Sequence, residues 1–196
     1  MNSGKLYVAQ FNNDGTGKWI ELAYGKNGLN DTNTVYPFKS QADVTTFARL
    51  AGDAVKATKM DRPEWVAVNP ENGEVYVTLT NNSNRGTTHA LDAANPRNYS
   101  DPEGDGMWFD PRGVLWIQTD DGAYTDTTNC MMLAALPGKV GDGAKAITSA
   151  GQETIVGKQV TDENLRRFLT GPKQCEITGV TMTGLQSDFH QCSTSW

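Results

Sequence analysis

Residues 61–80 read DRPEWVAVNPENGEVYVTLT, and this stretch decides the fold. Two runs rich in valine and aromatic residues, 65–68 and 74–80, flank a turn sequence that contains Pro, Asn and Gly, which is typical of a β-hairpin. About forty residues later the pattern returns, because residues 107–120 read MWFDPRGVLWIQTD. A hairpin with a proline turn and an aromatic strand that recurs at this period indicates the blades of a β-propeller.

Further hairpin and helix signals surround this repeat. Residues 5–11 and 18–22 predict two strands joined by a turn that contains Asn, Asp and Gly. Residues 40–43 read SQAD, a capping box that predicts the start of a helix. The apolar residues of that helix recur at helical spacing: Val44, Phe47, Leu50, Ala51 and Val55. Residues 161–164 could begin a second short helix.

These elements predict an all-β fold class. We expect a partial β-propeller of antiparallel blades with one or two short helices, in a single domain over residues 1–196. Residues 171–183 resemble the first strand of a further blade. The hairpins nevertheless number about three, short of the roughly four to eight blades that close a propeller ring. An open arc leaves unpaired strand edges, through which we expect that the chain can self-associate.

Composition and charge exclude several partners. The 17 basic and 23 acidic residues give a net charge of -6, and no run of Lys or Arg forms a nucleic-acid footprint. No stretch of about eighteen apolar residues is present, so no membrane span is expected. Residues 1–5 show no signal peptide, which leaves open a cytoplasmic protein or a piece of an exported one. An acidic chain attracts phosphate only through a local cation.

The residues that could hold a metal are mainly oxygen donors. The cysteines are Cys130, Cys175 and Cys192, without CxxC spacing, and the histidines are His89 and His190. A zinc site rich in histidine or cysteine is therefore not indicated. Carboxylate oxygens favour a hard cation such as Ca²⁺.

Six ordered blocks of the sequence resemble one known family. They are residues 62–67, 73–83, 94–97, 104–110, 115–120 and 171–179. From about residue 4 to residue 189 the chain is similar to the C-terminal half of the PhoX-type alkaline phosphatases. The resemblance implies a six-bladed β-propeller that hydrolyses phosphate monoesters, with calcium (Ca²⁺) and iron (Fe³⁺) at the propeller centre. It also implies export by the twin-arginine route, and hence a periplasmic or secreted location.

The resemblance implies roles for four residues. Arg62 would contact phosphate and Glu64 would bind metal, and both are expected to be catalytic; Asp105 and Glu176 would be further carboxylate ligands of calcium. A guanidinium offers a planar pair of N–H groups to two phosphate oxygens. In an extended segment Arg62 and Glu64 would share one face, and Pro63 would stiffen the pair. Clustered carboxylates repel one another unless a cation is bound.

The chain is also expected to be an incomplete fragment of this family. The family's N-terminal half has no counterpart, the segment 97–104 is short, and the residues after Phe189 depart from the family pattern. Two other functions stay open: a non-catalytic calcium-binding propeller module, and a calcium-dependent lactonase-like propeller hydrolase. A lactone offers Arg62 no dianion to bind, which favours phosphate. Weaker site candidates are the loop residues Asn81, Asn82, Asp120 and Asp121.

Overall fold

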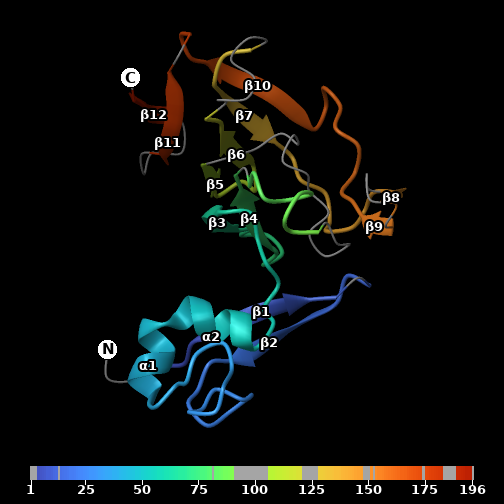
Figure 1. The fold of residues 1–196 in the computed structure, drawn as a ribbon. Helices are drawn as coiled ribbons and strands as arrows, with labels where there is room; N and C mark the ends of the chain where they lie inside the picture. Colours follow the sequence, from blue (N-terminus) through green and yellow to red (C-terminus); the bar gives the residue numbers. More distant parts are fainter. Residues whose placement is uncertain are drawn as a thin grey trace. The chain divides into compact units, whose positions relative to one another are not determined.

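A computed structural model of the chain describes residues 4–12, 14–80, 82–90, 106–120, 128–147, 151, 153–173, 175–182 and 189–195. Within these residues the regular structure is mainly antiparallel strand with two short helices, which confirms the all-β prediction. The chain divides into two compact units: the first contains the described residues up to Lys59 together with 147, 151 and 153–154, and the second contains the other described residues (Figure 1). Neither of the described helices is long and apolar enough to cross a membrane.

The first unit combines a hairpin with two helices. Strand β1 (Tyr7–Phe11) pairs antiparallel with β2 (Gly17–Glu21), which confirms the hairpin predicted near the N-terminus. Helices α1 (Gln41–Thr46) and α2 (Ala48–Ala54) follow. The buried apolar residues of this unit form one cluster: Leu22, Leu29, Phe38, Val44 and Ala51.

The capping box starts a helix as predicted, but the helix is interrupted. The Oγ of Ser40 accepts a hydrogen bond from the backbone N–H of Asp43 at 3.2 Å. The chain leaves helical geometry at Phe47, where φ is -103° and ψ is 40°. Three consecutive β-branched residues precede the break, and Thr45 Oγ1 donates to the carbonyl of Gln41 at 3.0 Å. Both features weaken a helix, so the single predicted helix is two short ones.

The second unit contains the hairpin predicted from residues 61–80. Strand β3 (Pro63–Val68) pairs antiparallel with β4 (Val75–Leu79). In the turn the backbone N–H of Asn69 donates to the carbonyl of Glu74 at 2.8 Å, and that of Gly73 donates to Asn69 at 2.9 Å. Gly73 has a φ of 75°, a conformation in which glycine meets no steric penalty. The turn residues therefore act as the sequence indicated.

A four-stranded antiparallel sheet forms the body of the second unit, in the order β10-β7-β6-β5. Its strands are β5 (Met107–Phe109), β6 (Leu115–Gln118), β7 (Met131–Ala135) and β10 (Leu165–Thr170). The β5–β6 pair confirms the second predicted hairpin. A further two-stranded sheet consists of β8 (Lys145–Ile147) and β9 (Glu153–Ile155).

Asp110 closes the turn between β5 and β6. Its fully buried carboxylate accepts hydrogen bonds from the backbone N–H groups of Arg112 at 2.8 Å and Val114 at 3.0 Å. The Arg112 guanidinium donates at 2.6 and 3.0 Å, and Trp116 Nε1 donates at 3.4 Å. Burial opposes ionisation of Asp110, but the hydrogen bonds outweigh it and hold the pKa below the usual aspartic acid value. Turn and strand therefore form one hydrogen-bonded unit.

The prediction of a second helix beginning at residues 161–164 is wrong, because these residues form a turn that leads into β10. Along β10, Leu165 pairs with Ala135 of β7. The ring of Phe168 meets that of Trp116 edge-on, with centroids 5.0 Å apart. Leu165 and Phe168, the apolar residues that suggested a helix, are therefore part of the sheet, because pairing with β7 outweighs the local preference for a helix.

The β3–β4 hairpin packs on the four-stranded sheet through one of its faces. Ala67 and Tyr76 are partly buried against the sheet's core, and the Tyr76 ring meets that of Phe109 with centroids 5.2 Å apart. The other face carries four exposed valines. They are Val66, Val68, Val75 and Val77, with relative exposures of 64%, 55%, 64% and 40%.

The last hairpin of the second unit lies beside β6. Strand β11 (Glu176–Met182) pairs antiparallel with β12 (Phe189–Ser195), which confirms the strand predicted within residues 171–183. The backbone N–H of Ile177 donates to the carbonyl of Thr119 at 3.5 Å. Glu176 is thereby placed next to the end of β6.

Candidate functional site

Arg62 and Glu64 lie where the chain enters β3, and the side chains of both are exposed. Arg62 has a φ of 48°, in the left-handed region that non-glycine residues rarely adopt. Arg62 and Glu64 therefore do not share one face through strand alternation, because Arg62 is not in the extended conformation that the prediction required. The register with β4 also shifts between Pro63 and Val66. The direction of the Arg62 side chain is therefore set by this local conformation and not by strand alternation.

Thr80 fixes the backbone just after the unusual residue. Its N–H and its Oγ1 both donate to the carbonyl oxygen of Arg62, each at 3.3 Å. Thr80 is itself buried, at 4% exposure. Pro63 follows directly and restricts φ. The chain that carries Arg62 and Glu64 is consequently held by β4 on its C-terminal side.

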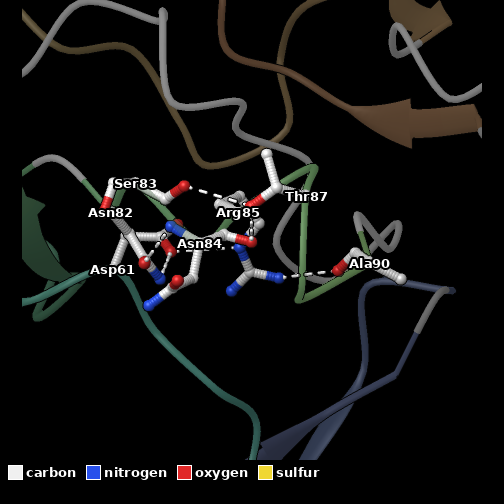
Figure 2. Close-up of polar contacts among 7 residues, drawn as sticks. All are labelled: Asp61, Asn82, Ser83, Asn84, Arg85, Thr87 and Ala90. Carbon is white, nitrogen blue, oxygen red and sulfur yellow. Dashed lines mark hydrogen bonds and ion pairs between the residues drawn. The ribbon is translucent and has the colours of Figure 1, made fainter.

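Asp61 fixes the backbone just before Arg62. Its side chain is buried and its Oδ1 accepts hydrogen bonds from Arg85 Nε at 3.0 Å and from Asn82 Nδ2 at 2.8 Å. Figure 2 shows these three side chains pointing toward one another. Asp61 and Arg85 are both only 3% exposed in their side chains, so the ion pair lies out of water. A buried charge is tolerated only when it is paired in this way.

The loop that supplies Arg85 is ordered by its own polar contacts (Figure 2). Arg85 Nη1 donates to the carbonyl of Ala90 at 3.1 Å. Thr87 Oγ1 donates to the carbonyls of Ser83 at 3.1 Å and Asn84 at 3.0 Å. These bonds close the loop on itself, so the guanidinium approaches Asp61 from a defined position.

Glu176, the other described carboxylate of the predicted site, is in a different sheet. It is the first residue of β11 and is half-buried. Its neighbours Cys175 and Ile177 are buried in the core, at 3% and 0% exposure. Glu64 belongs to the β3–β4 sheet and Glu176 to the β11–β12 sheet. Asp105, the third predicted ligand, lies outside the described residues.

The described residues do not bring together enough ligands for the predicted metal site. Within the part of the chain that the structure describes, no group of three or more His, Cys, Asp or Glu side chains is close enough to hold a metal ion. Glu64 and Glu176 therefore do not by themselves form a site for Ca²⁺, which takes about six to eight oxygen ligands.

Two residues of this region carried no recognisable signal in the sequence. Asp61 directly precedes Arg62, but its role depends on Arg85, which lies 24 residues further on. Arg85 belongs to a stretch rich in Asn and Ser that reads as a solvated loop. Asn82, a weaker site candidate, contacts Asp61, whereas Asn81 and Asp121 lie outside the described residues.

The sequence matches the family model described as alkaline phosphatase PhoX over residues 1–104 and 101–190. The chain belongs to the PhoX alkaline phosphatase family. Among solved structures, it is similar to Pseudomonas fluorescens PhoX in complex with vanadate, a transition state analogue, with 31% sequence identity and a TM-score of 0.67. That match covers 90% of this chain and 37% of the Pseudomonas chain. No curated protein matches.

The predicted relationship to PhoX is thereby confirmed. Arg62 and Glu64 lie within the first matched range, and Glu176 lies within the second. The chain spans little more than a third of the PhoX structure to which it is similar, 37% of that length. The antiparallel strands and short helices described above consequently correspond to a portion of the PhoX fold.

Proposed function

We propose that this chain carries part of a phosphate-monoester hydrolase site, in which Arg62 binds the phosphoryl group and Glu64 binds a metal ion. One observation supports the proposal above the others. In a chain of the PhoX family, the backbone around Arg62 is held on both sides by buried polar contacts while the side chains of Arg62 and Glu64 remain exposed. A fixed backbone that presents exposed functional groups suits a binding site.

Arg62 suits phosphate because of its shape and charge. A guanidinium presents parallel N–H groups that match two phosphate oxygens, and it stays protonated at any physiological pH. Since the chain has a net charge of -6, attraction of an anion must come from such a local cation. In the transition state of phosphoryl transfer, charge lies on the equatorial oxygens, where a positioned arginine stabilises it.

We also propose that Glu64, Asp105 and Glu176 supply carboxylates to a calcium and iron centre. The support is the family relationship and the preference of hard cations for oxygen ligands. Since no three potential ligands cluster among the described residues, the remaining ligands of the metal would come from residues outside the described part of the chain or from another chain. The proposal therefore requires either further parts of a PhoX protein or a second copy of this chain.

The partial β-propeller remains part of this proposal. One four-stranded antiparallel sheet and several two-stranded sheets are the kind of structure from which propeller blades are built. The 37% coverage of the Pseudomonas chain is consistent with a portion of a six-bladed ring. Such a portion leaves strand edges open, and we propose that the chain self-associates through them.

Hydrolysis of p-nitrophenyl phosphate by the purified chain, with Ca²⁺ and iron and then with chelator, tests the function. We expect chelator-sensitive turnover that falls about 10²- to 10³-fold in Arg62→Ala, as when a transition-state donor is lost elsewhere. Glu64→Gln should lose turnover together with calorimetric Ca²⁺ affinity. Arg167→Ala and Glu163→Gln serve as matched controls, because both residues are exposed and neither belongs to the β3–β4 hairpin that carries Arg62 and Glu64.

The outcomes separate the functions that the sequence left open. Calcium binding that requires Glu64, without any turnover, would identify a binding module. Turnover of a lactone but not of p-nitrophenyl phosphate would identify a lactonase-like hydrolase. Equal losses in Arg62→Ala and Arg167→Ala would remove the role assigned to Arg62.

A further inference from the structure

The buried ion pair next to Arg62 belongs to a small network of polar contacts. Asp61 Oδ1 receives two hydrogen bonds, at 3.0 Å from Arg85 and at 2.8 Å from Asn82. Arg85 is in turn tied to the carbonyl of Ala90. Replacing a buried ion pair by apolar residues is often neutral or stabilising, so such a pair is weak evidence of a role in stability alone.

The position of the Asp61–Arg85 ion pair, directly before Arg62, points to a role in the conformation of Arg62. Asp61 is bonded to the one described residue of the second unit, glycines aside, that has a positive φ, Arg62 at 48°. Such a conformation persists only where the surroundings impose it, and it is most often found at functional sites. The Asp61 contacts constrain the chain before Arg62, and the two hydrogen bonds from Thr80 constrain it after.

We propose that Asp61 is a positioning residue, which acts together with Arg85 to hold Arg62 in the left-handed conformation that aims its guanidinium at phosphate. This inference rests on the proposed function. Side-chain direction follows backbone dihedrals, so a relaxed φ at Arg62 would turn the guanidinium away from its present direction. Asp61 itself is not a phosphate ligand, since its carboxylate repels an anion and its Oδ1 accepts from Arg85 and Asn82.

Asp61→Asn tests the inference, because it keeps the size and an acceptor oxygen but removes the charge. The probe is inorganic phosphate, titrated calorimetrically into the full chain in the presence of Ca²⁺ and iron. We expect Asp61→Asn to weaken phosphate binding by about tenfold, a coupling within the usual range for contacting residues. In an Arg62→Ala background the same change should have no further effect, because Asp61 acts only through Arg62.

Asp162→Asn, an exposed aspartate in the turn before β10, is the matched control and should bind phosphate like the parent chain. Arg85→Lys provides a second variant, which retains the positive charge but not the planar guanidinium, and it should also weaken binding. A separate readout is hydrogen exchange of the Thr80 amide, which donates to Arg62 and should exchange faster in both variants.

Different results refute different statements. A folded Asp61→Asn chain with unchanged phosphate affinity and unchanged Thr80 exchange would overturn the inference while leaving the proposed function intact. An equal further loss in the Arg62→Ala background would also overturn it, since the effect would then not pass through Arg62. If Asp61→Asn does not fold, Arg85→Lys decides by the same criteria. Absence of phosphate binding by the parent chain would refute the proposal that Arg62 of this chain binds phosphate, and this inference with it.

Discussion

Asp110→Ala removes all the side-chain acceptor contacts that Asp110 makes in the β5–β6 turn in one substitution. Two of these contacts come from backbone N–H groups, at 2.8 and 3.0 Å, and one comes from the indole of Trp116, which is 4% exposed. Hydrogen bonds to a charged group contribute about 1.5–3 kcal/mol each but are not additive. The partner guanidinium is 58% exposed, so the ion pair itself adds only about 0–1 kcal/mol. We expect a loss of about 3–4 kcal/mol in unfolding free energy.

Asp110→Asn separates the stabilisation by the backbone N–H groups from that by the Arg112 and Trp116 donors. An asparagine oxygen can still accept from the two backbone N–H groups, but the NH₂ group then faces the Arg112 and Trp116 donors. The expected loss is about 1–2 kcal/mol. Arg112→Ala removes the guanidinium and should lose no more than about 1 kcal/mol.

Urea denaturation followed by tryptophan fluorescence measures all three variants. Trp116 is one of five tryptophans, and because it is buried in this sheet and donates to Asp110, its contribution to the emission changes when the sheet unfolds. The reasoning is refuted if Arg112→Ala loses as much as Asp110→Ala, because the backbone contacts would then contribute nothing. It is equally refuted if Asp110→Ala and Asp110→Asn have the same stability.

The same carboxylate predicts a pH dependence with a definite sign. The pKa of Asp110 is lowered in the folded chain, so its ionisation favours folding wherever the unfolded group is also ionised. That contribution is complete above about pH 4, the unfolded pKa, and is lost as the pH falls through the lower folded value. The stability advantage of the parent chain over Asp110→Asn should therefore shrink on acidification below about pH 4.

Two further predictions concern the first helix and the sheet interior. Ser40→Ala removes the cap that accepts from Asp43, and it should destabilise the first unit by about 1 kcal/mol, measured by thermal melting followed by circular dichroism. Gln118 is fully buried, and among the described residues neither of its amide atoms has a hydrogen-bond partner. Gln118→Met, which keeps the length without the polar atoms, should raise the urea midpoint by an amount equivalent to about 1–2 kcal/mol; a lower midpoint would mean that the amide has a partner beyond the described residues.

The hairpins could be predicted because their signals are local. The turn at residues 69–73 and the turn that begins at Asp110 contain residues that favour reversal of the chain, and the flanking runs are rich in strand formers. The capping box at Ser40 is local in the same sense. Each of these elements forms where the sequence placed it, to within a residue or two.

The errors arise where distant contacts outweigh local preference. Strand β10 replaces the predicted helix because β7 offers a pairing edge and Trp116 offers a packing surface for Phe168. The interruption at Phe47 depends on the back-bonded hydroxyl of Thr45, which a pattern of apolar residues does not reveal.

The candidate site was predictable only in part. Arg62 and Glu64 follow from resemblance to the PhoX family, and the structure leaves both exposed at the start of β3. The left-handed backbone at Arg62 is bonded to Thr80, 18 residues further on, and the buried pair of Asp61 with Arg85 spans 24 residues. No spacing rule encodes such contacts. Glu64 and Glu176 belong to different sheets, and among the described residues no group of three or more potential metal ligands brings them together.

The Asp61–Arg85 contact also bears on how this region can change in length during evolution. Surface loops usually accept insertions, because a longer loop adds little to the entropy of closure. Here the loop after β4 carries a guanidinium that must reach a buried carboxylate next to Arg62. An insertion between Thr80 and Arg85 would therefore disturb the start of β3, which pairs with the end of β4 at the open end of the hairpin. Length in that loop is constrained by the arginine at the start of β3, although the two are remote in sequence.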